Sequence, residues 1–206
     1  MSCDHTLNTI YLLISNGASV NFTYPVGLKK STILIEGLKQ ICTKFREQIY
    51  VKEYIQICKN EVNNLLGFEC DPSLPDSDGH DAWMNLILLN NYDLLDVMIS
   101  YFYKNTVPID NDLKDKFGKS HLHLIVNPNK FGWIKNTNIL ELFLKHSLGK
   151  LNAKDNQGRT AYELAAELRA PDHLKIFEDN SMLDEKLKIT EVENSDMEQE
   201  FTKVNV

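Results

Sequence analysis

The sequence has no excess of basic residues and no long apolar run. Its 22 lysines and arginines are outnumbered by 29 aspartates and glutamates, which gives a net charge of −7. Because an acidic protein repels phosphate groups, neither nucleic acid nor an anionic membrane is expected as a partner. No apolar stretch approaches the roughly 18 residues that a membrane-spanning helix needs, so no membrane insertion is expected.

The sequence also lacks paired cysteines. Cys3, Cys42, Cys58 and Cys70 are scattered, and none lies at zinc-binding spacing from another cysteine or a histidine. Four cysteines could form two disulfides, but the N-terminus has no signal segment, and the hydrophobic content of 43% is enough for a core without cross-links. These features favour reduced thiols in an intracellular protein, either cytoplasmic or nuclear.

Patterns typical of catalysis are missing as well. There is no glycine-rich phosphate loop and no nucleophile motif. His121 and His123 are two residues apart, so on a helix they point in different directions and cannot share a metal ion. Glu163 and Glu167 share a helix face, but no nucleophile or histidine stands beside them, which favours a solvated surface. The sequence predicts no catalytic residue, cofactor or metal, and nothing in it supports an independent hydrolase.

What the sequence does contain is a recurring turn. Glycines recur at intervals of 39 and 40 residues, each three residues after an aspartate and two before a residue that can cap a helix. The aspartate can accept backbone N–H groups in a turn, the glycine supplies a positive φ, and the capping residue begins a helix. Three units of this kind are predicted, with glycines Gly79, Gly118 and Gly158, aspartates Asp76, Asp115 and Asp155, and caps Asp81, Ser120 and Thr160.

Each unit should contain two helices, according to the spacing of its apolar residues. Adjacent helix pairs are expected to bury Leu86, Leu88, Leu94, Leu95, Met98, Leu122, Ile125, Leu140, Phe143, Leu144, Leu164, Leu168, Leu174 and Phe177. Asp93 is expected to cap the second helix of the first unit, and Ser31 or Thr32 an earlier helix that precedes the units. The predicted helices span residues 8–14, 33–45, 51–66, 81–89, 93–103, 120–126, 138–146, 160–168 and 172–178.

The three units resemble the ankyrin repeat, whose pattern reads D-x-x-G-x-T-P-L-H-x-A. The matching segments are DSDGHDAWMNL from Asp76, DKFGKSHLHLI from Asp115 and DNQGRTAYELA from Asp155. Its proline is replaced in every unit, and its histidine is kept only as His123. The resemblance implies an all-α solenoid of stacked helix pairs with extended inter-repeat loops, in which Trp83 faces the core and His123 bonds a neighbouring hairpin. It also implies non-catalytic binding of a protein or peptide.

Three regions are expected along the chain. Residues 1–70 should form a degenerate N-terminal repeat with capping helices, because LLISNGASVN is typical of a repeat's end. This could be a half-repeat that caps the stack or part of something longer. Residues 71–178 should hold the ankyrin-like repeats. Residues 179–206 carry eight carboxylates and three lysines, which predicts an acidic, disordered tail.

Partner binding is expected where the units differ, at the outward-pointing hairpin tips and in the insertion at residues 127–138. The two aromatic residues of the insertion could either pack on neighbouring helices or contact a partner. Such insertions also resemble ankyrin arrays attached to some large poly-ADP-ribosyl-transferring enzymes, so this chain could alternatively be the array of such an enzyme, without its catalytic module. The candidate partner-binding residues are His80, Lys116, Phe117, Lys119, Phe131, Trp133, Gln157 and Arg159.

Overall fold

The computed structural model describes residues 3–21, 23–26, 29–47, 52–105, 109–110, 112–127 and 136–180. These residues are mostly helical, with one two-stranded sheet. A further helix covers residues 171–180. The labelled elements are α1 (Cys3–Ser15), β1 (Thr23–Val26), β2 (Lys29–Thr32), α2 (Ile33–Glu47), α3 (Lys52–Gly67), α4 (Ala82–Leu88), α5 (Tyr92–Lys104), α6 (His121–Val126), α7 (Thr137–Lys145) and α8 (Ala161–Glu167).

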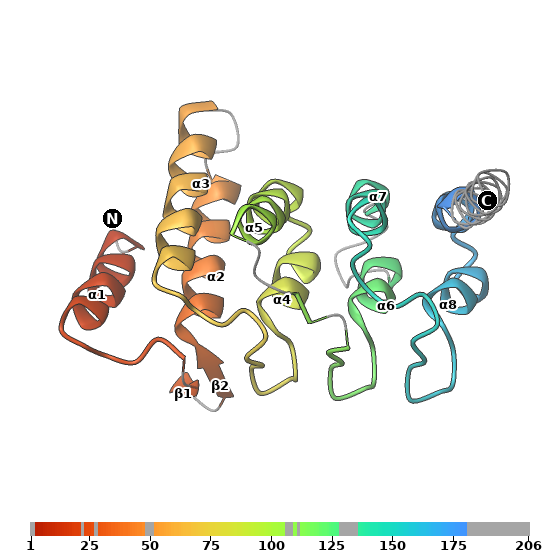
Figure 1. Cartoon of the computed structure of the whole chain (residues 1–206), viewed down its shortest axis with the longest axis horizontal. Helices are drawn as coiled ribbons and strands as arrows, with labels where there is room; N and C mark the ends of the chain where they lie inside the picture. The colour runs from red at the N-terminus through yellow and green to blue at the C-terminus, as the bar shows by residue number, and fades with distance from the viewer. Residues whose placement is uncertain are drawn as a thin grey trace, which may run out of the picture.

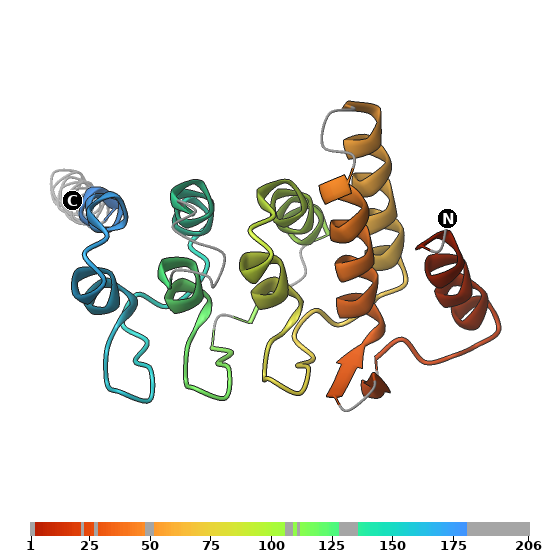
Figure 2. The same ribbon diagram turned by 180° about the vertical axis from the view of Figure 1, so that it is seen from behind.

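The helices form two layers. Helices α2, α4, α6 and α8 stand side by side in one row, and α3, α5, α7 and the helix of residues 171–180 form a second row beside it (Figure 1). A hairpin precedes each helix of the first row, and all the hairpins project from the same side, as the reverse view also shows (Figure 2). Helix α1 packs against α2 at the N-terminal end. The chain is therefore a row of hairpin–helix–helix units, which we number one to four from β1.

The turn chemistry predicted for the last three hairpins is confirmed. In each, one carboxylate oxygen of the aspartate accepts two backbone N–H groups at 2.8–3.0 Å. The glycine three residues later has a φ of 73–80°, which side chains of L-residues rarely tolerate. A shared local sequence thus builds the same turn around Asp76, Asp115 and Asp155.

The predicted helix caps are confirmed with one exception, the cap of α5. Asp81, Ser120 and Thr160 cap α4, α6 and α8 as predicted. The prediction for α5 was wrong, because its cap is Asn91, whose side chain accepts the Leu94 N–H at 3.1 Å, while Asp93 lies inside the first turn. Asn90 has a φ of 52° and ends the preceding helix, so the chain turns early enough for the next helix to begin at Tyr92.

Residues 23–67 form a unit of the same order, which includes a hairpin that the sequence did not predict. Strands β1 and β2 pair antiparallel, with Thr23 opposite Thr32. Thr32 then accepts the Ile35 N–H at 3.2 Å, so it occupies the capping position of α2. Helices α2 and α3 have 15 and 16 residues, which makes this helix pair longer than those of the later units.

The core lies between the two layers of helices. Trp83 is 2% exposed and meets Phe102 edge to face at 5.3 Å, which confirms its predicted core position. Three residues expected in the core, Leu88, Leu168 and Leu174, are only partly buried, because they lie near helix ends. Among the described residues, no helix combines the length and the apolar character needed to cross a membrane. The expected core residues that are buried are Leu86, Leu94, Leu95, Met98, Leu122, Ile125, Leu140, Phe143, Leu144, Leu164 and Phe177.

Candidate functional site

The four hairpin tips are joined to one another by backbone hydrogen bonds. The Ser77 N–H donates to the Lys30 carbonyl at 3.0 Å, and the Lys116 N–H donates to the Asp78 carbonyl at 3.3 Å. The Asn156 N–H completes the series by donating to the Phe117 carbonyl at 3.1 Å. Because each tip is fixed by the one before it, their side chains are displayed along a continuous edge of the molecule, which we call the tip row.

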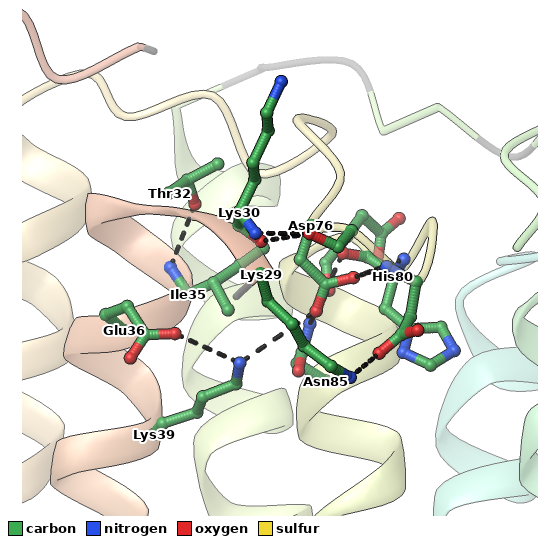
Figure 3. A network of polar contacts seen from close by, with 12 residues as sticks. Lys29, Lys30, Thr32, Ile35, Glu36, Lys39, Asp76, His80 and Asn85 are labelled. Atoms are coloured by element: carbon green, nitrogen blue, oxygen red, sulfur yellow. Dashed lines mark hydrogen bonds and ion pairs between the residues drawn. The ribbon is translucent and has the colours of Figure 1, made fainter. Parts of the chain in front are cut away.

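The joint between the first three tips is electrostatic as well. Asp78 forms ion pairs with Lys116 of the next tip and with Lys29 of the previous one. These two lysines, Lys116 first, hold the pKa of Asp78 well below its usual range. Figure 3 shows the adjoining network, in which Lys39 lies between Glu36, at 3.1 Å, and Asp76, at 4.0 Å.

Asp76, Asp78 and His80 also offer ligand atoms within 4.8 Å of one another, the spacing of a possible metal site. The Asp76 carboxylate is already an acceptor for two backbone N–H groups, and Asp78 is paired with two lysines. The lysines supply the positive charge that a cation would bring. The contacts of the cluster therefore hold neighbouring hairpins together.

Three of the candidate residues on the tips are presented to solvent. The Phe117 side chain is 56% exposed, a large fraction for an aromatic residue, and the Lys116 Nζ lies 5.3 Å from the centre of its ring. Gln157, on the next tip, is also exposed. Together they place an aromatic ring, an ammonium group and an amide on adjacent tips.

Arg159 does not point away from the protein as predicted. Its guanidinium folds back onto Asp155, with Nη2 at 2.8 Å and Nε at 3.1 Å from Oδ2, and its Nη1 donates to Glu167. Burial acts to raise the pKa of Asp155, but the hydrogen bonds from Arg159 and from two backbone N–H groups outweigh it and lower the pKa to about 2. Arg159 is thus committed to holding its own hairpin in shape.

His80 and Lys119 are half-buried, so they are less exposed than Lys116, Phe117 and Gln157. The His80 Nε2 lies 3.7 Å from Asp115 Oδ2 of the next hairpin, which keeps the ring against its neighbour. The exposed candidates on the tip row are therefore Lys116, Phe117 and Gln157. The other two candidates, Phe131 and Trp133, lie outside the described residues.

Two buried histidines connect neighbouring units. His123 Nε2 donates to the Arg159 carbonyl at 2.8 Å, so its Nδ1 is the acceptor that faces the Ser120 hydroxyl at 2.8 Å. This confirms the predicted structural role of His123. His121 Nε2 donates to Asp81 Oδ2 at 2.8 Å, with both side chains buried. The sequence did not predict that pair, because no local spacing connects residues 40 positions apart.

The two glutamates of α8 contact different partners. Glu163 accepts the Thr160 backbone N–H at 2.7 Å, a bond that lowers the pKa of Glu163. Glu167 instead pairs with Arg159. Each carboxylate stabilises the end of the row, which agrees with the surface role expected for them.

No protein-family model matches the chain, and a search of the curated proteins found no significant match. Interpretation of the tip row therefore depends on its geometry and on the sequence pattern.

Proposed function

We propose that the chain is an ankyrin-repeat scaffold, without catalytic activity, that binds a partner protein or peptide at its tip row. The observation that supports this most is the recurrence of one turn in three consecutive hairpins, each with the same aspartate bonds and the same positive φ at glycine. Stacked helix-pair units of this kind build extended surfaces that suit the binding of proteins.

The burial pattern favours the tips over the helices behind them as the contact surface. All six residues of α6, and the first six of α4, are buried. By contrast, Lys116, Phe117 and Gln157 present side chains of three chemical kinds on adjacent tips. A partner segment would contact these side chains before it reached the helices.

The tip residues also indicate the chemistry of the partner. An exposed aromatic ring is a frequent energetic anchor of protein interfaces. Beside it, Lys116 and Lys29 share the single carboxylate of Asp78, so these three groups keep a net positive charge that would attract a carboxylate. We therefore propose that the partner segment carries an apolar residue next to an acidic one. Scattered thiols, of which Cys42, Cys58 and Cys70 are buried and not in disulfides, fit an intracellular setting for this interaction.

A capture experiment tests the proposal. Immobilised full-length chain and the double variant Phe117→Ser/Gln157→Ala would each be used to recover proteins from a cell extract. Tyr92→Ser is the matched control, because Tyr92 is a 37% exposed aromatic residue on α5. The expected result is that the tip variant loses most of the specifically recovered protein while the control retains it. Equal recovery by all three would contradict the proposal.

The alternative, an array of a poly-ADP-ribosyl-transferring enzyme, stays a prediction from the sequence. It depends on the insertion at residues 127–138, of which residues 128–135 lie outside the described part of the chain.

A further inference from the structure

A cavity of about 520 Å³ lies between the helix pairs of the first and second units, beside the stems of the second and third hairpins. Helix α3 contributes one wall, α5 another, and the connections at residues 69–73 and 109–113 form its sides. A volume of this size is typical of sites that enclose a small ligand or a side chain with its neighbours. The apolar lining consists of Leu66, Trp83, Tyr101, Phe102, Ile109 and Leu113.

The floor of the cavity is apolar and rigid. Trp83 and Phe102 are 2% and 3% exposed and lock together edge to face. The thiol of Cys70 lies in the same lining, and burial raises the pKa of Cys70 to about 11. Tyr101 is held in place by its hydroxyl, which donates to the Leu66 carbonyl at 3.1 Å. Such a floor is preformed for an apolar group.

The rim, in contrast, is acidic. Glu69, Asp71 and Asp110 line the cavity, and no lysine, arginine or histidine does. Glu69 and Asp110 are exposed and Asp71 is half-buried, so the carboxylates lie at the entrance while the aromatic rings lie deeper. In the described part of the chain, none of the three forms an ion pair with a basic side chain. Their field adds to that of a chain with a net charge of −7.

We propose that this cavity binds an apolar side chain of a peptide partner that carries lysine or arginine on each side of it. The apolar side chain would enter between the aromatic floor and the aliphatic walls, and the flanking cations would stay at the rim beside the carboxylates. The charge of the rim decides between occupants, since an acidic peptide would meet three carboxylates and no basic side chain in the lining. This inference rests on the proposed function in that the ligand is a peptide, but it names a second site with the opposite charge preference to the tip row.

Titration of the full-length chain with short peptides tests the inference. The probe is acetyl-Gly-Lys-Leu-Lys-Gly-amide, and the readout is the indole N–H resonance of Trp83, which Trp133→Phe assigns because the chain has only two tryptophans. Two peptides serve as comparisons, one with leucine replaced by glycine and one with both lysines replaced by glutamate. Leucine amide separates a peptide site from a site for small amines.

The expected result is saturable movement of the Trp83 resonance with the first peptide and at least tenfold weaker binding of the other two peptides and of leucine amide. The variant Glu69→Gln/Asp110→Asn, which keeps the shape of the rim, should weaken binding of the first peptide at least tenfold. Glu141→Gln, on the exposed surface of α7, should not. Equal binding of all the peptides, an unchanged affinity in the rim variant, or binding of leucine amide as tight as that of the peptide would overturn the proposal.

The experiments can contradict the tip-row proposal and the cavity proposal independently of each other. If Phe117→Ser/Gln157→Ala abolishes partner recovery while Trp83 responds to no peptide, the cavity proposal is wrong and the proposed function stands. If the rim variant loses peptide binding and the tip variant still recovers every partner, the tip row is wrong and the cavity stands.

Discussion

The third and fourth units begin with the same hairpin turn, but the residue three positions after the helix cap makes different contacts in the two units. In the third unit, His123 is fully buried and reaches forward to the Arg159 carbonyl of the following hairpin. In the fourth, the equivalent residue is Glu163, which turns back and accepts the N–H of its own cap, Thr160. The same local sequence pattern therefore supports a contact between units at His123 and a contact within one unit at Glu163.

This comparison separates two kinds of stabilisation in the row. In the middle units, two buried histidines find a partner in a neighbouring unit, because His121 bonds Asp81 and His123 bonds the Arg159 carbonyl. In the fourth unit, Arg159 pairs with Asp155 and Glu167, all within the same hairpin and helix. These ion pairs therefore stabilise the fourth unit from within.

The largest effect should come from the capping residues. Asp81→Ala removes the cap of α4 and leaves the buried His121 N–H without its acceptor, and should lower the free energy of unfolding by about 2–4 kcal/mol. Thr160→Ala, at the equivalent position of the fourth unit, loses only a cap and should lower it by about 1 kcal/mol. Urea unfolding of both variants measures the difference, and a double-mutant cycle with His121→Ala should show strong coupling.

Next in size is the difference between His123 and Glu163. His123→Ala removes a fully buried side chain together with its bonds to the Arg159 carbonyl and the Ser120 hydroxyl, and should lower the free energy of unfolding by about 2–3 kcal/mol. Glu163→Ala affects an exposed side chain, so its loss should be clearly smaller. Urea unfolding at neutral pH compares the two, and equal losses would show that the forward bond of His123 is unimportant.

A smaller effect concerns pH and the fourth hairpin. Since the pKa of Asp155 is lowered from 3.8 to about 2, its charged form stabilises the folded state fully above pH 4, and this contribution is lost as the pH falls towards 2. The urea midpoint of the wild type should therefore fall over that range. Asp155→Asn should reduce this dependence, and an identical pH profile for both proteins would argue against the Asp155–Arg159 pair.

Local patterns predicted the parts of the fold that depend on a few neighbouring residues. The aspartate, glycine and cap of each turn lie within six residues, so the three hairpins and the start of the helix after each could be placed from the sequence. The hairpin of β1 and β2 has no such aspartate and glycine. Its place in the row is shown by the bond from the Ser77 N–H to the Lys30 carbonyl, which joins residues 47 positions apart.

Contacts that form only in the folded chain explain what the sequence missed at the candidate site. Arg159 was expected to be free, although Asp155 stands four residues before it and Glu167 eight residues after it, because the folded path of the hairpin brings all three together. The cavity over Trp83 joins residues from α3 to position 113, and no motif indicates it. The Arg159 contacts depend on the folded path of one hairpin, and the cavity depends on packing between units, so a short motif in the sequence indicates neither.

The central claim, that neighbouring tips of the row fix one another, can be tested with two glycines. A Cβ on Gly118 would lie 2.8 Å from the Asn156 backbone nitrogen of the next tip, whereas a Cβ on Gly158 would meet nothing within 4 Å, and both residues have a positive φ. Gly158→Ala should therefore cost only backbone strain, about 1–2 kcal/mol, and Gly118→Ala should cost at least about 1 kcal/mol more, because overpacking is added to the same strain. Urea unfolding that shows this difference supports the tip-to-tip joint, and equal losses for the two variants would contradict it.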